Sequence, residues 1–338
     1  MGLSSFLRPF FSTAFIGVDV DGRFCKVYVL ARKNGQTKEE FCKEFKAFDN
    51  KLPAEAAKLI RAYKRKYPFT YLGSISKTYN QGVIDTTQRV KLSKFGIKPD
   101  ENLFIRMRNW ACYIQKRAVA ESRARYLQAL GLDFLFSPFI MIYTIIAHKM
   151  LRTRNCLYVL QQRSNISLLV ADKKNVFFGG YFPLSSDLEG IGDDDNEHSE
   201  ISSILDMKNI DGLAGTSPEE LRELGELDGI DEEVLEQEIA PKELKNRKKA
   251  QGEQARIEEL RDLARANDTS EIITNCVSEF YSNDMYKSDF LDKIILLDTY
   301  GISNQAVEHI RNSLLMDIEV RPVDVTKTLI ELMQRENP

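Results

Sequence analysis

The sequence contains few of the residues that build metal sites and disulfides. Its 338 residues include only five cysteines and three histidines. The cysteines form no Cys-x-x-Cys pair and their number is odd, which predicts free thiols in a reducing compartment. Because His148, His198 and His309 lie far apart in the sequence, we expect no His/Cys metal site.

Long hydrophobic segments are also missing. The longest apolar run, 134–147, covers 14 residues and includes Ser137 and Pro138, whereas a membrane-spanning helix needs about 20. The apolar start of the chain lacks the long central region of a signal peptide, and Phe6 stands where the myristoylation pattern needs Ser or Thr. We therefore expect a soluble cytoplasmic protein in which 134–147 is a buried strand and helix.

The net charge is close to balance but unevenly distributed. Between Asp187 and Glu238 there are nineteen acidic residues against Lys208 and Arg222, a local net of −17, which leaves +14 for the rest because the whole chain carries −3. This asymmetry predicts an exposed acidic arm on a basic body. The basic stretch 242–265 lacks interleaved aromatic residues for base stacking, so we expect no nucleic-acid partner.

Two stretches of the chain share one layout. Each has three short strands joined by tight turns and followed by helical segments. These strands are expected at 15–20, 24–31 and 40–45 in the first stretch, and at 156–160, 166–171 and 176–181 in the second. The turns of the first stretch are predicted at Asp21-Gly22 and Lys33-Asn34-Gly35, since both sequences favour hairpins.

Hydrophobic periodicity and capping residues predict the remaining elements. We expect further strands at 71–75, 110–114, 134–136, 294–297 and 318–320. We expect helices at 52–66, 117–130, 138–151, 242–266, 271–281, 303–315 and 323–334, and short helices at 199–205 and 217–224. No Walker G-x-x-x-x-G-K-[ST] and no G-x-G-x-x-G motif is present.

One hairpin carries a family resemblance. The segment from Gly17 to Val27, with Asp19 and Lys26 as the retained residues, resembles the first phosphate loop of the actin-like ATPases. It is most similar to the PilM family of type IV pilus proteins and to the cytoplasmic part of the type II secretion protein GspL. The segment 129–132, the second group of strands and the stretch 294–302 follow in the order in which that family has its other landmarks.

The departures from the family pattern lie in all three nucleotide loops. Asp21 replaces a loop glycine, and Arg23 and Phe24 replace small hydroxyl residues, although phosphate must approach such a backbone closely. A carboxylate facing phosphate is repulsive by about 1 kcal/mol or more. The second loop, 161–165, has neither Asp nor Gly, and the turn 298–301 has a tyrosine at a glycine position.

We therefore interpret the nucleotide site as vestigial. Its predicted remnants are Asp19, Asp21, Gly22 and Lys26 in the phosphate loop and Gly301 in the adenosine-side turn. We expect no catalytic residue, no metal and no cofactor, with at most weak binding of ATP and magnesium. The chain is thus expected to be a pseudo-ATPase rather than an enzyme.

The resemblance implies an α/β fold with mixed sheets, the duplicated actin-like or ribonuclease-H-like architecture of two lobes with insertions. We expect an apolar N-terminal tail at 1–13, a first lobe at 14–150 with an inserted subdomain at about 67–130, and a second lobe at 151–338. The second lobe should contain a charged insertion, acidic and then basic and helical, at about 185–268.

The resemblance also implies a role. It suggests a cytoplasmic scaffold at the inner face of the inner membrane, within a type IV pilus, type II secretion, DNA-uptake or flagellar machine. Its expected partner is an inner-membrane bitopic protein resembling PilN, within a ring or larger oligomer. The apolar tail could add a peripheral membrane contact, since a basic body suits an anionic surface.

Two other functions stay open at this point. One is an active actin-fold ATPase or small-molecule kinase, which needs intact phosphate loops. The other is a ribonuclease-H-like nuclease, in which Asp19 and Asp298 would hold metal ions.

Overall fold

A computed structural model describes residues 11–48, 50–87, 95–147, 154–184, 232–286 and 289–336, with the backbone alone between 232 and 255. The chain divides into two compact units, Met1–Ser185 with Asp262–Pro338, and Ser186–Arg261. The predicted helices at 199–205 and 217–224, the tail residues 1–10 and most of the acidic arm lie outside the described residues.

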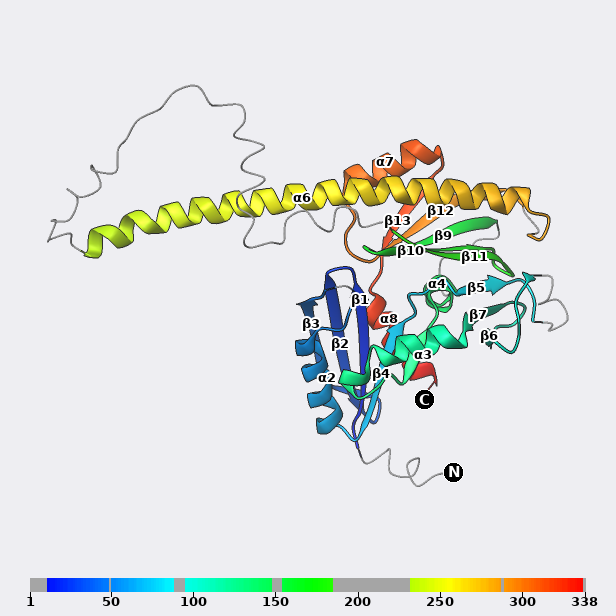
Figure 1. The fold of residues 1–338 in the computed structure, drawn as a ribbon, viewed down its shortest axis with the longest axis horizontal. Coiled ribbons are helices and arrows are strands. Elements are labelled where there is room, and N and C mark those ends of the chain that lie inside the picture. The colour runs from blue at the N-terminus through cyan, green and yellow to red at the C-terminus, as the bar shows by residue number, and fades with distance from the viewer. Residues whose placement is uncertain are drawn as a thin grey trace. The chain divides into compact units, whose positions relative to one another are not determined.

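The first sheet of the larger unit has five strands in the order β3-β2-β1-β4-β8 (Figure 1). Its strands are β1 (Thr13–Asp21), β2 (Phe24–Lys33), β3 (Gln36–Lys46), β4 (Phe69–Ile75) and β8 (Phe134–Phe136). β2 is antiparallel to β1 and β3, whereas β4 is parallel to β1 and β8. The central strand β1 is buried along almost its whole length, as expected for a nearly continuous apolar sequence.

The second sheet repeats this topology with the order β11-β10-β9-β12-β13. Its strands are β9 (Asn155–Gln161), β10 (Asn165–Ala171), β11 (Val176–Pro183), β12 (Leu291–Asp298) and β13 (Ile318–Pro322). The first three are antiparallel neighbours, and β12 is parallel to β9 and β13. The repeat predicted from the two groups of three strands is therefore present as two sheets of identical strand order.

A third, smaller sheet lies between β4 and β8 in the chain. It has the order β5-β7-β6 and consists of β5 (Gln81–Ile84), β6 (Asn102–Arg106) and β7 (Ala111–Gln115). Only β7 had been expected, because β5 and β6 are short and carry no strong alternation. Since β4 belongs to the first sheet, the inserted segment begins after Ile75 rather than at about 67.

Helices cover both large sheets. They are α2 (Ala54–Lys66), α3 (Lys116–Ala124), the 3-10 turn η3 (Leu127–Ala129), α4 (Pro138–Ala147), α7 (Asn304–Leu314) and α8 (Val325–Glu336). The helix expected at 117–130 is shorter, because α3 ends at Ala124 and the 3-10 turn η3 follows it, closed by the positive φ of Leu130. No helix in the described part of the chain combines the length and hydrophobicity needed to cross a membrane.

The C-terminal helix α8 packs on the first sheet, although it follows the last strand of the second (Figure 1). It contacts β1, β2, β4 and α4. A Cβ atom on Gly17 of β1 would lie 2.4 Å from the carbonyl oxygen of Thr326. Only glycine allows this approach of helix and strand.

One long helix, α6 (Glu232–Ser282), replaces the two helices expected at 242–266 and 271–281. The residues between them, 267–270, include Asp, Thr and Ser, which have weak helix propensity. Within the larger unit, Ala266, Ile273 and Phe280 of α6 are fully buried in the core of the second sheet. This burial holds the segment helical despite its weak intrinsic propensity.

Candidate functional site

The two hairpins that open the large sheets meet at one carboxylate. β1 ends at Asp21, and the turn that follows is Gly22-Arg23 rather than the expected Asp21-Gly22, since Asp21 pairs with Phe24 in the ladder. Gly22 has φ of 61° at the first central position, as in a type II′ turn. Asp21 is therefore a strand residue, and its side chain reaches the β9–β10 hairpin.

The Asp21 carboxylate is bound by the second hairpin. It accepts hydrogen bonds from the backbone N–H of Arg163 at 2.7 Å and of Ser164 at 2.9 Å, and from the Ser164 hydroxyl at 2.7 Å. The carboxylate is buried, with Asp21 only 5% exposed. The N–H groups of a turn form an anion-binding concavity, and here the protein's own carboxylate occupies it.

A buried lysine completes the arrangement. The Lys77 ammonium, just after β4, lies 3.0 Å from the Asp19 carboxylate and 3.5 Å from that of Asp21, and it donates to the carbonyl oxygen of Val20 at 2.6 Å. Asp19 also accepts a hydrogen bond of 2.8 Å from the side-chain amide of Gln162. We refer to Asp19, Asp21, Lys77, Gln162, Arg163 and Ser164 as the hairpin cluster.

The two carboxyl groups of the cluster respond differently to burial. Burial raises the pKa of Asp21, but Lys77 and the hydrogen bonds from Ser164 and Arg163 outweigh it, so the pKa is lowered from its ordinary value. For Asp19, burial dominates over Lys77 and the charge of Asp21 adds to it, so the pKa is raised. Burial alone would lower the pKa of Lys77, yet the two carboxylates raise it. The cluster therefore favours a charged Asp21 and Lys77.

The N–H group of the first turn is also occupied. The backbone N–H of Gly22 donates to the side-chain oxygen of Asn50 at 2.8 Å. Asn50 itself has φ of 52°, a conformation that asparagine tolerates better than most residues. The turn that the family resemblance assigns to phosphate is thus bound to a side chain from the loop before α2.

An arginine links the remaining departures from the family pattern. The Arg163 guanidinium lies 4.2 Å from the ring centroid of Phe24 and 5.0 Å from that of Tyr300. Arg265 lies 5.4 Å from the same Tyr300 ring. Each contact has the geometry of a cation–π interaction. Phe24 and Tyr300, which the sequence placed in two separate loops, are joined through one side chain.

The turn after β12 is stabilised by its own carboxylate. Asp298 accepts hydrogen bonds from the N–H groups of Tyr300, Gly301 and Ile302 at 3.0–3.1 Å. Gly301 has φ of 85°, which explains the glycine at this position. The predicted remnant Gly301 therefore shapes this turn.

Lys26 lies apart from the hairpin cluster. Its ammonium is 2.8 Å from the carboxylate of Asp324, the residue before α8. Asp19, Asp21 and Gly22 thus lie among the contacts of the two hairpins, whereas Lys26 ties β2 to the start of the C-terminal helix. Sequence reasoning missed Lys77 and Asn50, since neither stands in a recognisable motif.

These contacts limit the chemistry available at the site. Both oxygens of Asp21 are engaged by the second hairpin, and the Asp298 carboxylate is engaged by its own turn. Within the described ranges no group of three or more His, Cys, Asp or Glu side chains could hold a metal ion.

Two family models match the chain. A model of a family described as "Domain of unknown function (DUF8341)" matches residues 157–338, and one described as "Domain of unknown function (DUF8569)" matches residues 10–143. No curated protein matches the chain.

One solved structure shares the architecture at low identity, and two others are similar with lower scores. The PilM–PilN type IV pilus biogenesis complex is 13% identical over 93% of this chain and 89% of that one, with a TM-score of 0.50. A Bacteroides thetaiotaomicron protein of actin-like ATPase fold is 9% identical over 98% and 99%, with a TM-score of 0.46. An activator of 2-hydroxyisocaproyl-CoA dehydratase from Clostridium difficile, with bound ADPNP, is 8% identical over 96% and 98%, with a TM-score of 0.38. The predicted actin-like fold is confirmed.

Proposed function

The chain belongs to the DUF8341 family, and from the contacts of its hairpin cluster we propose that it is a scaffold of actin-like fold that does not hydrolyse ATP. The observation that carries this proposal is the Asp21 carboxylate, which accepts three hydrogen bonds from Arg163 and Ser164. A phosphate group at the same place would have to displace it. Hydrogen bonds to charged groups contribute about 1.5–3 kcal/mol each, and the displaced carboxylate would stay close to the phosphate.

The other nucleotide loops support the same proposal. The backbone N–H of Gly22 in the first turn donates to Asn50. Tyr300 stands at a position where the family has glycine, and its ring contacts the Arg163 guanidinium. A nucleotide would have to break these contacts as well. We infer that these contacts hold the two large sheets together and leave no room for a ligand.

We propose that the scaffold serves an envelope-spanning machine. The fold similarity to the PilM–PilN complex supports a role in which the chain binds the cytoplasmic segment of an inner-membrane protein resembling PilN. The machine would be a type IV pilus, type II secretion, DNA-uptake or flagellar assembly, with the chain in a ring or oligomer at the inner face of the membrane. Co-purification of a bitopic membrane protein with the chain tests this part of the proposal.

A thermal-shift experiment with Mg-ATP tests the absence of nucleotide binding. A ligand present at about 1,000 times its Kd stabilises a protein by about 4 kcal/mol, so micromolar binding would raise the Tm clearly at millimolar ATP. We expect no shift, and no heat in an isothermal titration. Micromolar binding with turnover would contradict the proposal.

A variant tests whether Asp21 is the group that excludes phosphate. Asp21→Ser removes the carboxylate and frees the N–H groups of Arg163 and Ser164. We expect this variant to gain weak binding of ATP, at least about tenfold stronger than any binding by the parent. The matched control Asp292→Ser, at an exposed ion pair with Arg154, should bind no better than the parent. If Asp21→Ser also fails to bind, the carboxylate alone does not account for the exclusion of phosphate.

The enzyme alternatives predict different results. An active ATPase or kinase predicts turnover by the parent chain, whereas a nuclease predicts Mn²⁺-dependent cleavage of a nucleic-acid hybrid. The contacts of Asp19 with Lys77 and of Asp298 with its own turn favour the scaffold.

A further inference from the structure

The strand β6 forms an open edge of the small sheet. Lys116 N–H donates to the carbonyl oxygen of Glu101, and Met107 N–H donates to that of Trp110, both at 2.9 Å. Residues 101 and 107 are therefore hydrogen-bonded to β7 and its extension. Because this pattern alternates along an antiparallel pair, the N–H and C=O groups of residues 102, 104 and 106 point away from β7. In the part of the chain that the structure describes, no strand pairs with them.

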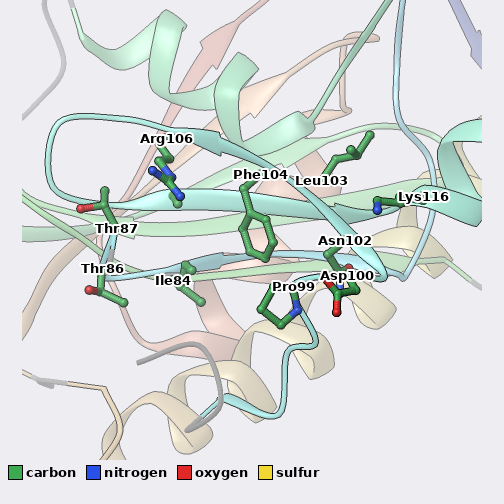
Figure 2. Close-up of a pocket in the computed structure, with 11 residues that line it drawn as sticks. Ile84, Thr86, Thr87, Pro99, Asp100, Asn102, Leu103, Phe104, Arg106 and Lys116 are labelled. Carbon is green, nitrogen blue, oxygen red and sulfur yellow. The ribbon is translucent and has the colours of Figure 1, made fainter. Parts of the chain in front are cut away.

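A pocket of about 410 Å³ lies beside this strand (Figure 2). Phe104, Ile84 and Pro99 line its centre, and Figure 2 shows Arg106 toward one end and Lys116 toward the other. Asp100 is the one acidic residue in its lining, so the pocket has an apolar centre with two basic groups against one carboxylate.

The opposite face of β6 is also apolar. Leu103 is 45% exposed and Ile105 is 42% exposed. Side chains alternate between the two faces of a strand, so the side chains of Leu103 and Ile105 lie on the face away from Phe104, although Leu103 also borders the pocket. An unpaired edge with apolar residues on both faces is unusual in a soluble protein, which normally protects such edges.

The charge around β6 is positive. Residues 95–125 contain seven basic and three acidic residues. Two of the acidic residues, Glu101 and Glu121, already pair with Lys98 and Arg117. Among the described residues, Arg106, Arg108 and Lys116 have no ion-pair partner. This surplus of positive charge around β6 would attract an acidic ligand.

From these features we propose that β6 binds an extended segment of a partner protein by strand addition, and that this segment alternates apolar with acidic side chains. Its backbone pairs with residues 102, 104 and 106, which is the main source of affinity in this mode of binding. One apolar side chain enters the pocket at Phe104, and acidic side chains face Arg106 and Lys116. The inference rests on β6 alone and holds whether or not the hairpin cluster excludes nucleotide.

A labelled synthetic peptide that alternates valine with glutamate tests the proposal by fluorescence anisotropy with the full chain. We expect saturable binding, and about tenfold weaker binding to Arg106→Glu and to Lys116→Glu. The matched control Arg123→Glu makes the same charge change on an exposed position of α3 that does not line the pocket. It should bind like the parent chain.

Two further probes separate strand addition from general charge attraction. The same peptide with every backbone nitrogen methylated has no N–H group to donate along either edge and should lose binding. A polyglutamate peptide of equal length should bind at least about tenfold more weakly, because it has no apolar anchor. Equal binding of either probe would overturn the proposal. Self-association of the full chain that Arg106→Glu abolishes would instead assign the edge to a second copy.

Discussion

Among single residues, Asp21 has the most consequential position. Its carboxylate is buried, accepts three hydrogen bonds from the second hairpin and lies 3.5 Å from the Lys77 ammonium. The sequence predicts that the Asp21 carboxylate repels phosphate. The structure shows that the same charge is satisfied by the protein itself, in a place where the second hairpin offers N–H groups.

Asp21→Asn should destabilise the chain. The amide keeps the shape of the side chain but loses the charge that Lys77 and the two N–H groups bind. We expect the free energy of unfolding to fall by about 2–4 kcal/mol, measured by urea denaturation. Asp292→Asn removes the charge from an exposed pair with Arg154 and should cost less than about 1 kcal/mol. Equal losses for the two variants would contradict a special role of the hairpin cluster.

The two carboxyl groups predict opposite pH dependences of stability. The pKa of Asp19 is raised in the folded state, so acidification through that value, down to the unfolded pKa of about 3.9, should increase stability. The pKa of Asp21 is lowered, so its contribution is complete above about 3.9 and is lost as the pH falls through the folded value.

Urea midpoints measured across this pH range check both signs. Asp19→Asn should remove the gain on mild acidification, and Asp21→Asn should reduce the loss at lower pH. If Asp21→Asn leaves the acid loss unchanged, other carboxyl groups carry it. Glu39, whose pKa is lowered to about 2 by Lys66 and Tyr67, is the first of these to examine.

At the scale of elements, α8 joins the C-terminal end of the chain to the first sheet. Its buried residues include Val325, Leu329 and Met333, and its N-terminal approach is anchored by the Lys26–Asp324 pair. The sequence predicted the helix from its amphipathic pattern. Its packing partner was not predictable, because β1 lies about 300 residues earlier in the chain.

Two glycines of the first sheet test this packing. In Gly17→Ala the new Cβ would lie 2.4 Å from the Thr326 carbonyl oxygen, a backbone atom that moves only with the helix. In Gly73→Ala it would lie 2.7 Å from Sδ of Met333, a flexible side chain. We expect Gly17→Ala to cost about 2–4 kcal/mol and Gly73→Ala about 1 kcal/mol, measured by denaturant unfolding. The reverse order would mean that α8 does not approach β1 this closely.

At the scale of the whole molecule, much of the fold was predictable because its hairpins and helix ends carry local sequence signals, and because the arrangement of three strands occurs twice. The hairpins at 15–31 and 156–171 and the helix signal at Ser303, which accepts a hydrogen bond from the Ala306 N–H, follow from local turn and cap chemistry. The short strands β5 and β6 were missed because they combine few residues with a mixed polar and apolar sequence, unlike the mainly apolar β7 and β8.

The site was predictable only in part. A local motif singled out Asp19, Asp21 and Gly22 as expected remnants of a phosphate loop, but the contact between Asp21 and Ser164 joins residues 143 positions apart. Lys77 and Asn50 have ordinary sequence neighbours, and only the fold brings them to the two hairpins. Local sequence motifs therefore point to the loops, whereas the hydrogen bonds between the two hairpins can be seen only in the folded chain.

The division into two units supports a prediction about the acidic arm. Met1–Ser185 and Asp262–Pro338 form one compact unit that includes both large sheets, so its stability should not depend on residues 187–231. Replacing those residues by a Gly/Ser linker of similar length preserves the reach of the connection while removing its charge. We expect the Tm of the larger unit to change by less than about 2 °C, because connections of similar length have similar closure entropy. Differential scanning calorimetry at low and high salt measures this. A different result would contradict this expectation: the variant loses much of its Tm, and high salt lowers the Tm of the parent chain by a similar amount. Such a result would show that the acidic arm stabilises the basic body electrostatically.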